Sequence, residues 1–370
     1  MITHLSEQEI FGRRVRQARE RAGFTLRALS EEVEKLGSAL AFPTLANYEA
    51  GRFLPDEANL VALARALKTD PGSFFRPFRC ELTDLHFRKK RSFGAKDRTV
   101  LEARAEEFFE HYFEIEELTG ALRNFESPKV SLKRVATADE AEEYANLLRK
   151  AWDLGVASLP VVTELLEEKG IKIYETKVET AGFDGLQADA GSVPVIILNA
   201  GTENCRLSVP RRRLTAVHEL GHAVLPLPKE IDQNETLSEP LVWRFAGAFM
   251  LPKEVFVSAF GQKRTRISLE ELIQLKLRFR ASIWAIMRRA QELELISRAS
   301  YDRFCRTAKE QKWHTVKEPG DDLFPDIPRN SRFCALARRA ASENLISESR
   351  RDAMLRAAGE RPDHKNEQTF

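Results

Sequence analysis

The stretch that decides the fold is RLTAVHELGHAVL, residues 213–225. Its apolar residues recur with a helical period and two prolines follow soon after, so we predict a helix over about residues 211–225. His218 and His222 are four residues apart, which places both imidazoles on one face of that helix. Polar side chains on so apolar a helix need partners. A metal ion is the simplest partner; the alternative is a surface helix whose histidines are hydrogen-bonded elsewhere.

The residues around these histidines indicate hydrolytic chemistry. Zinc suits two neutral imidazoles and one carboxylate, with a fourth position open for water. Glu219 follows the first histidine and can act as the general base that takes the proton of a metal-activated water attacking a peptide carbonyl. Gly221 permits another element to approach the helix closely. We therefore expect Zn²⁺, with Mn²⁺ as the alternative that these donors allow.

A third metal ligand has to come from elsewhere in the chain. The acidic residues that follow the histidine pair are Glu230, Asp232, Glu235, Glu239 and Glu254. Glu239 precedes an apolar stripe typical of a helix that packs on the metal helix, and we expect its first turn to present this carboxylate. By spacing alone, Glu235 is a competitor.

Away from this motif the pattern is mainly helical, with one small sheet. Alternating or short apolar runs predict strands at 171–175 and 193–198, with a turn between them marked by Gly182, Asp184 and Gly185. Thr137 and Glu140 have the spacing of a capping box. Helical periods recur at 100–124, 137–152, 159–169, 239–250, 268–277, 282–295, 298–312 and 331–357. The fold class expected is mainly α (α+β).

Residues 7–76 predict a bundle of short amphipathic helices. Gly23 ends the first helix, and Thr25 is expected to cap the second. The third helix is predicted from Thr44 to Tyr48, and a fourth apolar stripe follows at 60–67.

Charge is distributed unevenly along the chain. Residues 1–99 hold 18 Lys and Arg against 13 Asp and Glu, a surplus of five, whereas residues 100–128 hold two against eight. This favours a nucleic-acid-binding head followed by a solvated connector. The run 88–91 is read as a nucleic-acid patch or, equally well, a solvated linker. Residues 211–213 are read as a charged face with one structural arginine, or as a site that steers a substrate carboxylate.

Composition excludes several other classes. The four cysteines are scattered without a CxxC spacing, so we expect reduced thiols rather than a disulfide framework. No apolar run approaches 18 residues, and the N-terminus lacks the apolar core of a secretory signal. We therefore expect no membrane partner and a cytoplasmic location.

The run 213–222, followed by EPLVWRFAGAFMLP at 239–252, resembles the ImmA/IrrE family of metallopeptidases. In that family a helix of the type E-x-x-A-N-x-F-A-x-x-L-L-M-P follows HExxH, and its leading Glu is the third zinc ligand. The resemblance covers about 140–313 and implies that Glu239 completes the metal site. Val242 and Trp243 depart from it, because the family often has Ala-Asn there. Cleavage of very few protein substrates is also implied.

Residues 16–30 and 44–52 resemble the first two helices and the recognition helix of Cro/Xre-type helix-turn-helix domains. In such domains the N-terminal residues of the recognition helix contact base edges, which places Thr44 and Asn47 nearest the bases. Arg27, Arg52 and Lys68 are expected to contact phosphates.

Two differences from the helix-turn-helix pattern indicate that recognition of DNA bases is altered or weak. Leu26 stands where such domains usually carry Gln, and the segment 34–42 is longer than the usual turn. The alternative is a helical bundle that serves only dimerisation or docking. A homodimer is therefore among the assemblies that we expect the chain can form.

The sequence is thus divided into four parts. They are a five-helix helix-turn-helix domain at 1–78, a basic connector and acidic helix at 79–135, a zincin-like metallopeptidase domain at 136–262 and a helical C-terminal region at 263–370. The favoured function is a regulatory zinc endopeptidase that binds DNA and cleaves a repressor or antitoxin-like protein. The alternative is a DNA-binding regulator or antitoxin whose metal domain senses a ligand or partner without proteolysis. A third role, packing or partner contact, is left open for 331–357.

Overall fold

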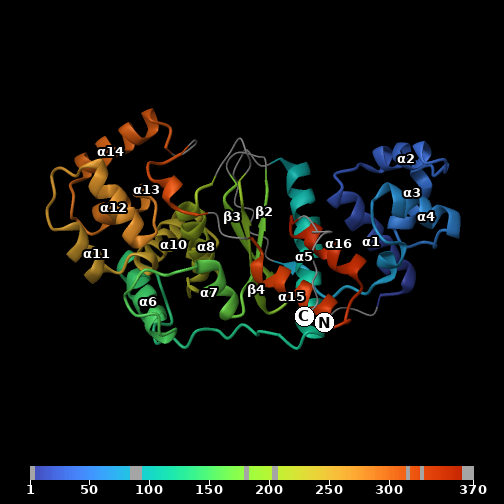
Figure 1. Cartoon of the computed structure of the whole chain (residues 1–370), viewed down its shortest axis with the longest axis horizontal. Helices are drawn as coiled ribbons and strands as arrows, with labels where there is room; N and C mark the ends of the chain where they lie inside the picture. The colour runs from blue at the N-terminus through green and yellow to red at the C-terminus, as the bar shows by residue number, and fades with distance from the viewer. Residues whose placement is uncertain are drawn as a thin grey trace. The chain divides into compact units, whose positions relative to one another are not determined.

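The computed structural model describes residues 5–83, 94–178, 183–201, 207–313, 317–325 and 329–360. Helices dominate these residues, and one four-stranded sheet accompanies them (Figure 1). The predicted mainly α class is therefore confirmed. The contacts divide the chain into two compact units: the first unit is 1–82, 91–122 and 333–370, and the second unit is 83–90 and 123–332. Compactness does not define domain boundaries, so the four predicted ranges remain predictions.

The first unit begins with four α-helices and a 3-10 helix. These are α1 (Glu7–Arg21), α2 (Leu26–Lys35), α3 (Phe42–Glu49), α4 (Glu57–Ala66) and η1 (Pro71–Phe75). Thr25 caps α2 as predicted, since its side chain accepts from the Ala28 N–H. The third helix starts two residues earlier than predicted, with Pro43 in its first turn. A Cβ on Gly12 would lie 2.4 Å from the Tyr48 carbonyl oxygen, so the close packing of α1 on α3 requires glycine.

A long helix, α5 (Ala95–Leu118), packs on α1 within the first unit. Arg14 pairs with Glu110, and Arg21 pairs with Glu107. Aromatic side chains of α5 such as Phe108 are completely buried. The expectation of a solvated connector is therefore wrong for this helix. Its negative charge reflects ion pairs to the basic face of α1 as well as contact with solvent.

The C-terminal helices α15 (Ser331–Ser342) and α16 (Glu348–Ala357) also belong largely to the first unit. The single helical segment predicted at 331–357 is broken, because Asn344 adopts a left-handed φ of 56° and Ser347 caps α16. Arg350 donates to Glu114 of α5 at 2.6 Å, and the Phe333 ring centroid lies 4.6 Å from that of Phe108. Of the roles left open for this segment, packing onto the chain is the one observed.

The Phe333 contact generates a stability prediction. Phe333→Ala removes a fully buried ring that contacts Phe108 and Tyr112, so we expect a loss of about 3–5 kcal/mol in the free energy of unfolding. Leu345→Ala is the matched control, because Leu345 is 41% exposed and its loss should change little. Denaturant unfolding followed by circular dichroism measures the stability of both variants. Equal unfolding midpoints for the two variants would contradict the stabilising role of the Phe333 contact.

The sheet of the second unit runs in the order β1-β3-β4-β2, from β1 (Leu82–Thr83), β2 (Lys172–Thr176), β3 (Gly185–Ala190) and β4 (Val193–Asn199). The strand β4 pairs antiparallel with β3 and parallel with β2. Of the residues predicted to mark the turn, Asp184 lies before β3, Gly185 is instead the first residue of β3, and Gly182 lies outside the described residues. The tight turn instead follows β3, where Gly191 has a φ of 67°.

The rest of the second unit, as far as it is described, is mainly helical. Its helices are α6 (Ala138–Ala151), α7 (Val162–Glu168), α8 (Val209–Val224), α9 (Lys229–Asp232), α10 (Glu235–Met250), α11 (Lys253–Phe260), α12 (Leu269–Phe279), α13 (Ile283–Glu292) and α14 (Arg298–Glu310), followed by the 3-10 helix η2 (Asp321–Leu323). The capping box of Thr137 and Glu140 at α6 is confirmed. The helix α8 packs on β3 and β4 and against α7 and α10, while α10 also packs on α6 (Figure 1).

A buried ion network joins three of these helices. Glu142 of α6 accepts two hydrogen bonds from Arg289 of α13, at 2.8 and 2.9 Å, and pairs with Arg244 of α10 at 2.5 Å. The Arg289 Nε also donates to the Leu251 carbonyl oxygen. Each buried charge has an opposite partner, so removal of one would leave an uncompensated charge in the core. The network therefore fixes α10 against α6 and α13.

Three further expectations concern residues away from the site. In the described part of the chain, no helix is long and apolar enough to cross a membrane. Cys80, Cys305 and Cys334 are free thiols, and burial raises the pKa of Cys80 above its ordinary value. Cys205 and the basic run 88–91 lie outside the described residues.

Candidate metal centre

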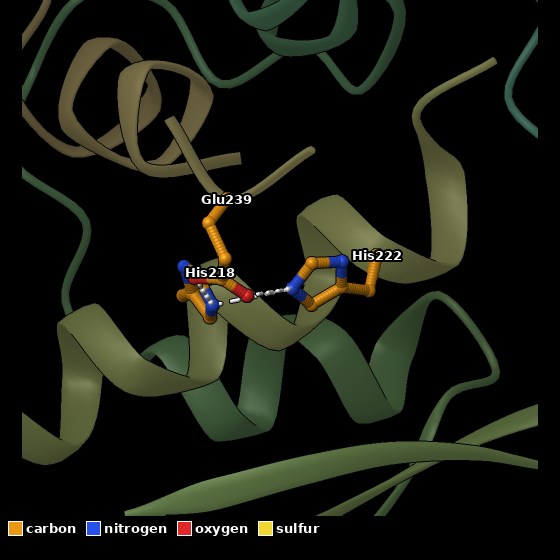
Figure 2. A group of neighbouring side chains, drawn as sticks. All are labelled: His218, His222 and Glu239. Atoms are coloured by element: carbon orange, nitrogen blue, oxygen red, sulfur yellow. Dashed lines mark hydrogen bonds and ion pairs between the residues drawn. The ribbon is translucent and has the colours of Figure 1, made fainter. Parts of the chain in front are cut away.

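Three donor side chains converge between α8 and α10. His218 and His222 extend from α8, and Glu239 extends from α10 toward both imidazoles (Figure 2). The two Nε2 atoms are 3.2 Å apart. The Glu239 carboxylate oxygens lie 3.5 Å from the Nε2 of His218 and 3.6 Å from that of His222. The two carboxylate distances end on different oxygens, Oε2 toward His218 and Oε1 toward His222, and one ligand atom from each of the three residues lies within 4.8 Å of the other two.

The cluster of His218, His222 and Glu239 has about the size that a zinc ion requires. Ligand atoms about 2.0–2.1 Å from a tetrahedral zinc are about 3.3–3.4 Å apart. The imidazole nitrogens are 3.2 Å apart, and each lies 3.5 or 3.6 Å from one of the two Glu239 oxygens, which is close to that value. Two imidazole nitrogens with one carboxylate are also the donor set of open, catalytic zinc sites. By size and donor chemistry, the residues present fit a zinc ion.

The third donor sits deeper in its helix than expected. The helix α10 begins at Glu235, with Asn234 as its N-cap, so Glu239 lies in the second turn rather than the first. Glu235 itself is exposed and is not a member of the three-donor cluster. Of the two carboxylates that spacing left in competition, the structure brings Glu239 to the histidines.

Gly221 sets the distance between the two helices that carry the donors. A Cβ at this position would lie 2.9 Å from both Phe245 Cδ1 and Val242 Cγ1 of α10. Real Cβ atoms do not approach neighbours this closely, so α10 could not keep its position beside a larger residue. The expectation that Gly221 permits close approach of another element is confirmed.

This contact gives a second prediction. Gly221→Ala should lower the free energy of unfolding by about 1–2 kcal/mol, because overpacking outweighs the gain in helix propensity. It should also weaken metal binding by displacing α10. Gly247→Ala on α10 is the control, since its Cβ would meet Glu292 Oε2 at an ordinary 3.4 Å. Thermal unfolding and zinc titration measure both variants; a Gly221→Ala protein as stable as Gly247→Ala would contradict the packing argument.

Glu219 is 7% exposed and does not belong to the three-donor cluster. It lies where α8 meets the start of β3. A Cβ on Gly185 would be 2.7 Å from Thr215 Cγ2 and 3.3 Å from Glu219 Cγ, so the strand passes close to this side chain. The Glu219 carboxylate thus lies on the metal-site helix directly after His218, buried and outside the three-donor cluster.

The three arginines that open α8 are all engaged in structure. Arg211 pairs with Asp184 at 2.9 Å, and Arg212 pairs with Glu175 at 2.8 Å. Arg213 donates to the carbonyl oxygens of residues 159, 160 and 280, and burial lowers its pKa to about 10. More than the one structural arginine that we predicted is present, and these contacts favour that interpretation over substrate steering.

Sequence reasoning missed one side chain at the centre. The indole of Trp243 lies against the His218 imidazole, with centroids 4.1 Å apart and planes inclined by 34°. The spacing could have predicted this position, because Trp243 follows Glu239 by one helical turn and so lies on the same face of the helix.

The residues predicted to contact DNA lie on or near α3. Thr44 and Asn47 are half-buried, whereas Arg27 and Arg52 are exposed. Asn47 Oδ1 accepts a hydrogen bond from Arg52 Nη1 at 3.0 Å, which leaves the Asn47 amide N–H₂ as a donor. The Arg27 guanidinium lies 6.0 Å from the centroid of the exposed Phe42 ring. The hydrogen-bonded pair of Asn47 and Arg52 thus lies on and just after α3, and the exposed Arg27 lies on α2.

The fold and site define a two-part protein: a helix-turn-helix bundle and an HExxH-type metal helix. Comparison with family models agrees with both parts. Residues 166–291 match a model described as the IrrE N-terminal-like domain of peptidase family M78, and residues 10–73 match a helix-turn-helix domain. The chain therefore carries an ImmA/IrrE-type metallopeptidase domain fused to an N-terminal helix-turn-helix domain. No curated protein matches the chain.

Proposed function

We propose that this protein is a DNA-binding, zinc-dependent endopeptidase that regulates genes by cleaving a repressor or antitoxin-like protein. The observation that carries the proposal is the cluster of His218, His222 and Glu239, whose donor types and separations suit zinc. The match to a peptidase family and the helix-turn-helix domain support a regulatory substrate over a digestive one.

The residues of the site would divide the work as follows. His218, His222 and Glu239 would hold the metal, whose Lewis acidity makes a water molecule more acidic and a peptide carbonyl more electrophilic. Glu219 accepts the proton of the attacking water on its carboxylate and returns it to the leaving amine. Burial keeps bulk water from competing for these proton transfers, since Glu219 is 7% exposed.

A second candidate function is a DNA-binding regulator whose metal domain senses a ligand or partner without cutting it. The helix-turn-helix domain favours it, because metal occupancy could bias DNA affinity within one chain. Glu219 favours the enzyme, because a sensor needs no general base.

A substitution at Glu219 separates these two functions. Glu219→Gln should retain zinc but lower cleavage by at least about a hundredfold, because the amide cannot accept the proton. A proteome-wide cleavage screen followed by kinetics on the identified protein measures the loss. Cleavage at the wild-type rate by the variant would overturn the mechanism, and the absence of any substrate of the wild type would favour the sensor.

Metal analysis supplies the control for this experiment. Glu239→Ala should lose zinc, whereas Glu235→Ala, which removes an exposed carboxylate outside the cluster, should keep it. Full zinc retention by Glu239→Ala would move the third ligand elsewhere. Substitution of Mn²⁺ into the metal-free protein tests the alternative cofactor.

DNA binding makes a separate prediction. Asn47→Ala should cost about 1–3 kcal/mol at the preferred site, since the proposed base contact is lost. Arg27→Ala should weaken binding to all sequences and lower the salt dependence by about one counterion. Gel-shift titrations over a range of salt, on DNA selected from random sequences, measure both. Binding that does not respond to salt, or no binding, would contradict the DNA-binding role and favour docking or dimerisation.

A further inference from the structure

Trp243 is placed by the same helix that supplies the carboxylate of the centre. It follows Glu239 by four residues on α10, so both side chains lie on one face of that helix. The carboxylate reaches the Nε2 of His218 at 3.5 Å, while the indole covers the imidazole ring with a centroid separation of 4.1 Å. One face of α10 therefore contacts His218 twice, once at the nitrogen and once on the ring.

The indole is itself held in place. Arg288 of α13 lies over the Trp243 ring, with Cζ 5.4 Å from the centroid. The Nε of Arg288 donates to Glu292 at 3.0 Å, and the next residue on α10, Arg244, donates to the Glu292 carbonyl oxygen at 3.1 Å. Trp243 is half-buried among these groups. The ring that touches His218 thus belongs to the anchored contact between α10 and α13.

The contact with Trp243 restricts the χ2 torsion of His218, which sets the direction of its imidazole nitrogens. The χ2 torsion of histidine is broad, because it joins an sp³ and an sp² carbon. A flat ring at 4.1 Å with a plane inclination of only 34° blocks rotation of His218 about that bond. The nitrogen that faces Glu239 and His222 is then kept in that direction.

We infer that Trp243 is a positioning residue: it fixes the His218 imidazole so that Nε2 faces the metal position before the metal binds. This inference rests on the proposed zinc site and deepens it. The physical effect is preorganisation, because a ligand ring that is already aimed loses less freedom when the ion arrives. A side chain that merely fills space on α10 would stabilise the fold equally well without affecting metal affinity.

The zinc affinity of the full chain distinguishes positioning of His218 from simple space filling by Trp243. Metal-free wild type, Trp243→Phe and Trp243→Leu are titrated with zinc against a chromophoric chelator. The Phe variant keeps a flat ring and should bind within about threefold of wild type, whereas the Leu variant should bind at least about tenfold more weakly. Trp284→Leu is the matched control, because Trp284 packs on Phe304 at 5.6 Å and should leave zinc affinity unchanged.

A second readout reports proximity without relying on stability. Cu²⁺ added to the metal-free chain should quench tryptophan fluorescence in wild type and in Trp284→Phe, and most of this quenching should disappear in Trp243→Phe. Thermal unfolding of the metal-free variants shows whether they fold alike. If Trp243→Leu does not fold, the quenching result on Trp243→Phe decides.

The outcomes separate this inference from the function on which it rests. Wild-type zinc affinity in a folded Trp243→Leu, or full quenching in Trp243→Phe, would overturn the positioning role while leaving the zinc site intact. Failure of the wild-type chain to bind zinc would overturn the proposed function and the positioning role together.

Discussion

The close contact between α8 and α10 is the constraint on which the metal centre depends. One helix carries two imidazoles and the other carries the carboxylate, so the separation of the helices sets the distance from the carboxylate to the imidazoles. That separation is possible because Gly221 has no side chain where Val242 and Phe245 of α10 press against α8. The cost of a glycine inside a helix is accepted here because a tighter packing distance is gained.

Other interactions keep this contact in register. The sheet supports α8 from β3 and β4. Glu142 binds Arg244 and Arg289, which fixes α10 against α6 and α13. The ligands are thus carried by two helices whose positions are each determined by several neighbours. Sites built on rigid elements hold their geometry better than sites on loops.

Local patterns in the sequence were enough to predict the part of the centre that is local. The spacing of His218 and His222 fixes their common face whatever the tertiary structure is, and the caps at Thr25 and Thr137 were read from adjacent residues. The start of α10, the strand β3 and the stacking of Trp243 were not predicted. Each of these depends on which distant segment packs alongside, and neither spacing nor composition contains that information. The acidic helix α5 shows the same limit, because a run of carboxylates looks the same whether it faces water or Arg14 and Arg21.

The helix α16 packs on α5 in the first unit, although the second unit lies between them in the sequence, and this has a consequence for synthesis. Glu114 and Arg350 are paired although they are 236 residues apart in the sequence. A ribosome releases the helix-turn-helix segment early, but the helices α15 and α16 that pack on α5 emerge only after the second unit. The second unit, whose residues are nearly contiguous, can fold while the first still lacks its final helices. A chain that is cut short before residue 333 therefore leaves Phe108 and Tyr112 of α5 without their Phe333 contact, so the first unit depends on residues made after the second unit.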